Sequence, residues 1–105
     1  MYRSIFLGLI LVHPATLALA EVHKVYQKGK SFSTQELKIK AGDSVVFHND
    51  DDTAHNVFSS SAGTRFNLKI QNPGTKNEQK FEKPGEGDIR CAIHPSMKIK
   101  LKIEE

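Results

Sequence analysis

The stretch Cys91-Ala92-Ile93-His94-Pro95-Ser96-Met97 places a thiol, an imidazole and a thioether at intervals of three residues. The chain has no other cysteine and only two methionines. This mixture of sulfur and imidazole ligands suits copper better than other common metals, whereas structural zinc sites usually recruit several Cys and His residues. A copper site with Cys, two His and a weak axial Met needs one more imidazole. The candidate is His55, 36 positions before Cys91.

The first 20 residues have the parts of a secretory signal peptide. Arg3 supplies the positive charge, an apolar run follows, and Ala18-Leu19-Ala20 is a small-x-small cleavage site. A membrane anchor is the alternative, but the apolar run is short for a span of about 20 residues, and Pro14 interrupts its continuation. We therefore expect a signal peptide over residues 1–20, a periplasmic domain over residues 21–105 and no stable membrane insertion.

Charge and cysteine count narrow the possible functions. Losing Arg3 changes the formal net charge from +3 to +2, and the lysines are scattered, which argues against a nucleic-acid partner. One cysteine cannot form an internal disulfide, so Cys91 alone indicates a buried inert thiol or an intermolecular bridge. Its neighbours His94 and Met97 favour a metal ligand instead. Neither a Ser-His-Asp motif nor a pair of carboxylates indicates a catalytic site, and we assign no catalytic residue.

Short apolar runs separated by turn signals predict an all-β domain. The expected strands cover residues 22–27, 32–39, 44–49, 53–58, 66–70, 77–83, 88–91 and 98–103. Ile99, Leu101 and Ile103 alternate with lysines in the last run, which places them on the core face. Adjacent apolar residues at 45–47 indicate a strand buried on both faces. The spacing of these runs predicts a small antiparallel β-sandwich.

Asp50-Asp51-Asp52 raises the possibility of a calcium site. Calcium loops need spaced ligands and a glycine turn, which this run does not have. We expect a solvated acidic loop.

Two segments resemble the cupredoxins, and among them the plastocyanin-like blue-copper proteins. Thr53-Ala54-His55-Asn56-Val57 is similar to their first-ligand segment, in which Asn and Val follow the ligand His. The segment Gly87–Met97 resembles the strand and ligand loop of amicyanins, with two residues between His and Met and a Pro after the His. The resemblance covers most of residues 21–105 and implies a Greek-key sandwich that binds one type 1 copper ion. The implied ligands are His55, Cys91, His94 and Met97.

Two residues of the ligand loop depart from the family pattern. Ala92 replaces the usual Ser or Thr, whose hydroxyl ties the loop to the Asn beside the first ligand, so we expect Asn56 to lack that partner. Ile93 replaces the usual Pro and keeps a backbone N–H. We predict that this amide donates a hydrogen bond to the Cys91 sulfur and raises the reduction potential, because hydrogen bonds to that sulfur tune blue-copper sites.

The resemblance implies an exported monomer that transfers single electrons. Transient redox contacts are small and weak, so the expected partner is a dehydrogenase, a reductase or a cytochrome that it meets briefly. The alternative is a periplasmic copper carrier or storage protein, in which the same ligands would hold Cu(I). An enzyme is less favoured, because four protein ligands leave the metal no open position.

His23 would become the third residue after cleavage following Ala20. A free amino group, two amides and an imidazole can bind Cu(II) or Ni(II) in a square plane. The alternative is an ordinary strand residue whose amide is already used by the sheet. Of the other histidines, His13 leaves with the signal peptide, and we expect His48 to be structural.

Overall fold

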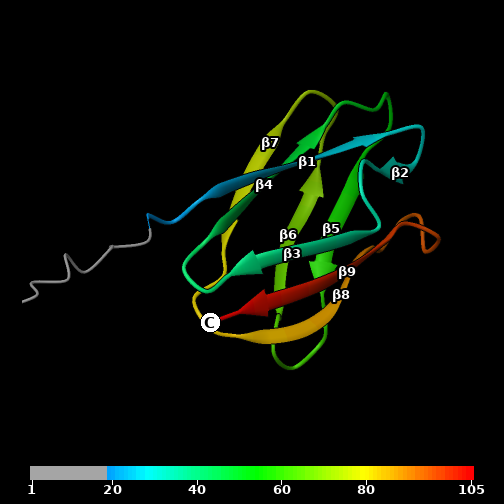
Figure 1. The fold of residues 1–105 in the computed structure, drawn as a ribbon. Helices are drawn as coiled ribbons and strands as arrows, with labels where there is room; N and C mark the ends of the chain where they lie inside the picture. The colour runs from blue at the N-terminus through cyan, green and yellow to red at the C-terminus, as the bar shows by residue number, and fades with distance from the viewer. Residues whose placement is uncertain (1–18) are drawn as a thin grey trace, which may run out of the picture.

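The computed structural model describes residues 19–105, which form two β-sheets packed face to face (Figure 1). The strands are β1 (Val22–Lys28), β2 (Ser31–Phe32), β3 (Glu36–Lys40), β4 (Ser44–Asn49), β5 (His55–Ser59), β6 (Phe66–Gln71), β7 (Lys76–Lys80), β8 (Gly85–Cys91) and β9 (Lys98–Glu104). Most of the predicted signal peptide lies outside the described residues. Within residues 19–105, no helix has the length and apolar character needed to cross a membrane.

The strand order confirms the predicted Greek-key sandwich. One sheet has the order β2-β1-β4-β7 and the other the order β3-β9-β8-β5-β6, so the chain repeatedly crosses between the layers. Two strand pairs are exceptions to the predicted antiparallel arrangement, since β1 and β4 run parallel, as do β3 and β9. Both pairs join strands that are distant in the sequence and are connected through the opposite layer, which allows them to point the same way.

The core consists of the inward faces of the strands. Ile99, Leu101 and Ile103 are buried as predicted. Val45 and Phe47 are also fully buried, but Val46 between them is only half-buried, so β4 has one core face rather than two. Full burial of each such side chain contributes about 1.5–3 kcal/mol, which makes this alternation the main stabilising feature of the sandwich.

Strand β6 departs from the alternation expected at residues 66–70. Lys69 has a φ of 61°, and the pairing of β5 with β6 shifts register between Asn56 and Phe58. A bulge of this kind moves the following side chains to the opposite face. Ile70 is consequently 61% exposed, and Gln71 is buried in its place.

Strand β8 passes very close to the connection between β5 and β6. A Cβ atom on Gly87 would overlap the side chains of Thr64 and Ser61. The Ser61 hydroxyl also accepts a hydrogen bond from the Asp88 amide at 3.1 Å. Only glycine fits this crossing, which fixes the position of the strand that leads to Cys91.

The pairing of β5 with β8 brings two distant parts of the chain together. Val57 lies opposite Cys91 in this antiparallel pair. The start of β5 and the end of β8 therefore meet at one end of the sandwich, where the loop between β8 and β9 also lies (Figure 1).

Candidate metal centre

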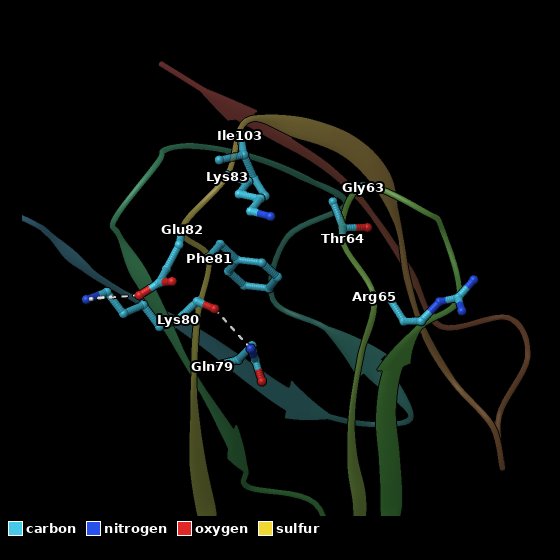
Figure 2. A pocket seen from close by; sticks show the side chains of 9 residues that line it. All are labelled: Gly63, Thr64, Arg65, Gln79, Lys80, Phe81, Glu82, Lys83 and Ile103. Carbon is cyan, nitrogen blue, oxygen red and sulfur yellow. Dashed lines mark hydrogen bonds and ion pairs between the residues drawn. The ribbon is translucent and has the colours of Figure 1, made fainter.

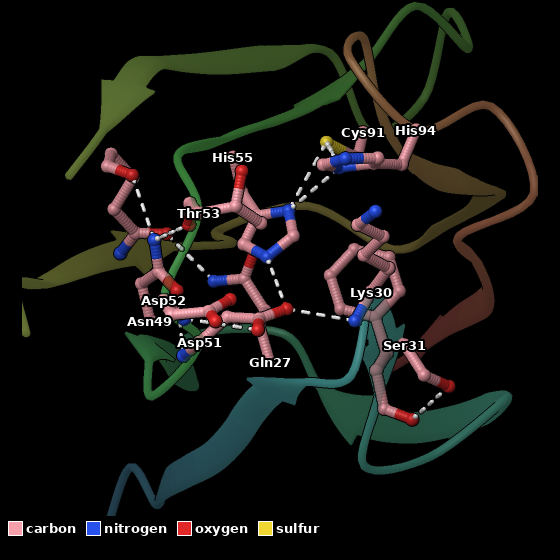
Figure 3. A network of polar contacts seen from close by, with 12 residues as sticks. Gln27, Lys30, Ser31, Asn49, Asp51, Asp52, Thr53, His55, Cys91 and His94 are labelled. Atoms are coloured by element: carbon pink, nitrogen blue, oxygen red, sulfur yellow. Dashed lines mark hydrogen bonds and ion pairs between the residues drawn. The ribbon is translucent and has the colours of Figure 1, made fainter. Parts of the chain in front are cut away.

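Three predicted ligands converge at this end of the sandwich. The Cys91 Sγ lies 3.7 Å from the His55 Nδ1 and 3.8 Å from the His94 Nδ1, and the two Nδ1 atoms are 3.1 Å apart (Figure 3). His55 opens β5, Cys91 closes β8, and His94 comes from the loop that follows. The structure thus places one sulfur and two imidazole nitrogens around a common point.

The size of this triangle fits a transition-metal ion. From its three sides, the central point lies about 2.1 Å from each corner, close to the ~2.0–2.3 Å of metal bonds to imidazole and thiolate. Thiolate and imidazole are the donors that a trigonal copper site uses. Met97 is 2% exposed, belongs to the same buried cluster as Cys91 and donates its amide to the His94 carbonyl at 3.0 Å. Met97 is therefore a buried residue at the C-terminal end of the same loop, tied to His94 through the backbone.

Backbone hydrogen bonds join the two ligand segments. The Asn56 amide donates to the Cys91 Sγ at 3.3 Å, and the Ala92 amide donates to the Asn56 carbonyl at 3.0 Å. Because residue 92 is alanine, Asn56 lacks the loop hydroxyl, as expected, and its side chain bonds to other groups instead. Its Nδ2 donates to the Asn67 Oδ1 at 3.0 Å and to the Lys69 carbonyl at 2.9 Å, both presented by the bulged strand β6.

The Ile93 amide, unlike the Asn56 amide, is not positioned as a donor to the Cys91 sulfur. Among residues 19–105, the backbone amide that donates to the Cys91 sulfur is that of Asn56, and no such hydrogen bond comes from Ile93. The proposed contribution of Ile93 to the reduction potential stays a prediction. Its side chain is 45% exposed, beside the half-buried His94, whereas His55 and Cys91 are buried. The His94 side of the site is therefore the side nearest solvent.

Comparison with known proteins agrees with this geometry. The family described as copper-binding proteins of the plastocyanin/azurin family matches residues 20–104. The chain belongs to this family. This cupredoxin is 37% identical to amicyanin-alpha of Methylorubrum extorquens over 78 residues, and 34% identical to amicyanin of Paracoccus denitrificans over 77 residues. Each match covers 70% of this chain, but only 64% and 58% of the respective relatives.

Solved structures show the same fold. A Cu(I) structure of an amicyanin mutant has a TM-score of 0.70 at 26% identity, covering 79% of this chain and 82% of that one. A purple cupredoxin from Nitrosopumilus maritimus has a TM-score of 0.69 at 26% identity and is covered over 99% of its length, against 78% of this chain. A copper-containing nitrite reductase from Thermus scotoductus has a TM-score of 0.72 at 29% identity; the match covers 79% of this chain but only 22% of the reductase.

Asp51 contacts the first histidine of this cupredoxin from behind. Its Oδ2 lies 3.0 Å from the His55 Nε2 and also accepts the Lys30 amide at 2.7 Å, while its Oδ1 accepts the Asp52 amide at 3.0 Å (Figure 3). The Lys30 amide, with smaller contributions from the His55 and Asp52 hydrogen bonds, holds the pKa of Asp51 well below its usual range despite the opposing effect of burial. The carboxylate is therefore ionised.

The prediction of a solvated acidic loop is consequently right for two residues and wrong for one. Asp50 and Asp52 are exposed, but the Asp51 side chain is only 8% exposed because the turn directs it toward His55. Three identical residues in a row do not reveal which one turns inward. The only available signal is the position of Asp51 four residues before the expected ligand.

A buried network of side-chain amides supports the same loop. Asn49 donates from its Nδ2 to the Thr53 carbonyl at 3.0 Å (Figure 3). The same nitrogen donates to the Gln71 carbonyl at 2.8 Å, and Gln27 donates to the Gln71 Oε1 at 2.7 Å. All three amide side chains are almost fully buried. The sequence pattern does not reveal them, because polar residues within strands usually lie on the solvent face. They fix both ends of the loop that precedes His55.

A second group of metal-binding residue types lies near the start of β1. This N-terminal cluster consists of Glu21, His23 and Asp43. The Asp43 carboxylate accepts the Glu21 and Lys40 amides at 2.9 Å each, and the His23 Nε2 lies 2.9 Å from its Oδ2. The His23 hydrogen bond and then the two amides lower the pKa of Asp43 to about 2. These contacts already occupy the carboxylate.

The backbone around His23 is also occupied. Val22 pairs with Ser44 and His23 with Val45 in the parallel β1–β4 ladder. A square-planar site would need both backbone amides as ligands and would therefore disrupt the pairing at this end of the ladder. The geometry favours the simpler alternative, in which His23 is a strand residue bonded to Asp43.

The pocket in Figure 2 lies at the opposite end of β5 and β8 from the metal centre. It has a volume of about 290 Å³ and is bordered by the loop at residues 63–65, by residues 79–83 and by Ile103. One of its lysines, Lys80, lies 3.8 Å from the Glu82 carboxylate. No residue predicted to belong to the site lines this pocket, so it does not extend the metal centre.

Proposed function

We propose that this cupredoxin is an exported, mononuclear blue-copper protein that carries one electron at a time. His55, Cys91 and His94 would form the strong trigonal ligand set, with Met97 as the weak axial ligand. The observation that supports this proposal is the convergence of one sulfur and two imidazole nitrogens within 3.8 Å of one another. Bound copper would supply the one-electron couple between Cu(II) and Cu(I).

The protein residues restrain the site and exclude water from it. His55, Cys91 and Met97 are buried, and the Asn56 and Ala92 amides tie the two ligand segments together. A restrained ligand set changes little when an electron arrives, which suits transfer rather than catalysis. Four protein ligands also leave no open position for a substrate. The nitrite reductase likeness covers only a small part of that enzyme and supports no enzymatic assignment.

His94 is the proposed exit for the electron. It is the only half-buried residue of the three convergent ligands, and the exposed Ile93 lies beside it in the chain. A small apolar surface around a ligand edge suits a brief contact with another redox protein. We propose a dehydrogenase, a reductase or a cytochrome as the partner, a periplasmic location and a monomeric state, all on the basis of the resemblance to amicyanins.

The visible spectrum of residues 21–105 loaded with copper tests this proposal. We expect a strong thiolate-to-copper band, one copper per chain and reversible electrochemical cycling, with the band lost in Cys91→Ala. A protein without the band would contradict the assignment of Cys91. A protein that shows the band but surrenders its copper rapidly to weak chelators would support the copper-carrier alternative.

A further inference from the structure

Behind the metal centre, Asp51 forms a second layer of contacts to the ligand His55. The two ring nitrogens of His55 face different groups: its Nδ1 points to the Cys91 sulfur and its Nε2 to the Asp51 carboxylate (Figure 3). Both oxygens of this carboxylate also accept backbone amides, from Lys30 and Asp52, so Asp51 faces His55 as a hydrogen-bond acceptor. A His that binds a metal is neutral, so in the metal-bound protein this contact places the ring proton on Nε2 and leaves the Nδ1 lone pair directed into the site.

In the part of the chain that the structure describes, no lysine or arginine side chain lies within ion-pairing distance of the Asp51 carboxylate. Among residues 19–105, the one side chain within ion-pairing distance of this carboxylate is that of His55 itself. Its other contacts are the neutral amides of Lys30 and Asp52. These amides hold the carboxylate in place without cancelling its charge. With a side chain only 8% exposed, Asp51 is also poorly screened by water.

We propose that Asp51 is a positioning residue that fixes the tautomer of His55 and lowers the reduction potential of the copper site. This inference rests on the proposed function and assigns to Asp51 a part in setting the reduction potential of the copper site. An uncompensated negative charge behind a ligand favours the more positive oxidation state of the metal. A hydrogen bond that the distal N–H of a ligand His donates to a carboxylate also orients the ring and increases its basicity.

The turn between β1 and β2 completes this arrangement. Gly29 and Lys30 both have positive φ values, of 61° and 54°, and this conformation places the Lys30 amide against the Asp51 Oδ2. The turn therefore belongs functionally to the site, although it supplies no ligand. It holds the carboxylate by a backbone donor that side-chain substitution does not remove.

The decisive experiment compares Asp51→Asn with Asp52→Asn by voltammetry of the copper-loaded protein. Both variants remove one negative charge from the same loop, but the Asp52 side chain is exposed. We expect Asp51→Asn to raise the potential, making reduction by a fixed one-electron donor about tenfold more favourable, or 59 mV. Asp52→Asn should change it less than twofold. Equal shifts in the two variants, or a lower potential in Asp51→Asn, would overturn the role of the charge.

A second measurement tests the tautomer without depending on the stability of a variant. In the reduced, diamagnetic wild-type protein, ¹⁵N NMR should show the His55 proton on Nε2, protected from exchange. Asp51→Ala should lose this protection and bind copper about 10–100-fold more weakly. A rapidly exchanging Nε2 proton in the wild type, or unchanged affinity in Asp51→Ala, would overturn the positioning role. If the wild type instead has no thiolate-to-copper band, the proposed function itself fails, which is a separate result.

Discussion

Residues 19–105 contain two Asp–His pairs of nearly the same geometry, and one of them belongs to the metal centre. The His55 Nε2 lies 3.0 Å from the Asp51 Oδ2, and the His23 Nε2 lies 2.9 Å from the Asp43 Oδ2. In both pairs backbone amides also bind the carboxylate. The pair alone therefore does not make a metal site.

The difference lies in what faces the other nitrogen of each ring. The His55 Nδ1 meets the Cys91 sulfur and the His94 imidazole in surroundings that exclude water. His23 is half-buried, and the other acidic group of its cluster, Glu21, is largely exposed. A metal centre thus requires convergent donors on the open nitrogen, whereas the same Asp–His contact elsewhere only fastens a strand.

The largest expected difference between the two Asp–His pairs is the effect on copper affinity of removing their histidines. We expect His55→Ala to weaken copper binding by more than about a hundredfold, since loss of a ligand should exceed the 10–100-fold typical of its supporting contacts. His23→Ala should leave affinity and the ratio of one copper per chain unchanged. Titration against a competing chelator measures both.

The same titration can show that the comparison is wrong. If the Cys91→Ser variant binds a second equivalent of Cu(II) and loses it on His23→Ala, the N-terminal cluster is a metal site after all. The square-planar hypothesis would then replace the structural role of His23.

The next largest effect concerns stability at the N-terminal cluster. Asp43→Asn should lower the free energy of unfolding by about 2 kcal/mol, because hydrogen bonds to a charged group are weakened. The pKa of Asp43 falls from 3.8 to about 2 on folding, so its stabilising effect is complete above the unfolded value and is lost as the pH falls toward 2.

Urea unfolding at several pH values measures this effect, with the exposed Asp50→Asn as the matched control. The difference between wild type and Asp43→Asn should be constant near neutral pH and shrink between about pH 4 and pH 2. A difference that grows on acidification would show that the carboxylate does not stabilise the fold in its charged form.

The smallest expected effect is on the reduction potential and concerns the Cys91 sulfur. The N-terminal cluster has no sulfur ligand, so this test addresses a feature that only the metal centre has. If the Ile93 amide contributes a hydrogen bond to Cys91 in the copper-loaded protein, Ile93→Pro should lower the reduction potential. The change should be smaller than the one expected for Asp51→Asn. An unchanged or higher potential in Ile93→Pro, measured by voltammetry, would leave the Asn56 amide as the backbone donor to the sulfur.

The core strands and the ligand loop could be predicted from the sequence because they depend on the spacing of nearby residues. Alternation at Ile99, Leu101 and Ile103 predicted a core strand, and the spacing of Cys91, His94 and Met97 predicted a ligand loop. His55 needed more than local information, since the pairing of β5 with β8 brings it to the loop. The resemblance to cupredoxins supplied that long-range contact.

The remaining features depend on interactions that sequence patterns do not encode. The bulge at Lys69 reverses the faces of β6, so an apolar Ile70 points outward and Gln71 joins the core. The inward turn of Asp51 depends on a backbone amide from Lys30, 21 residues away. The composition of residues 50–52 indicates a charged loop but does not show which of its three carboxylates is buried.

The close packing at Gly87 limits which substitutions this cupredoxin can accept in the loop at residues 61–64. Three residues separate this glycine from Cys91, and strand β8 has a fixed rise per residue between them. The remote loop at residues 61–64 thereby sets the distance at which the sulfur stands from the imidazoles. A larger side chain in that loop would displace strand β8 and, with it, the Cys91 sulfur. The metal centre would then change although none of its own residues had been substituted.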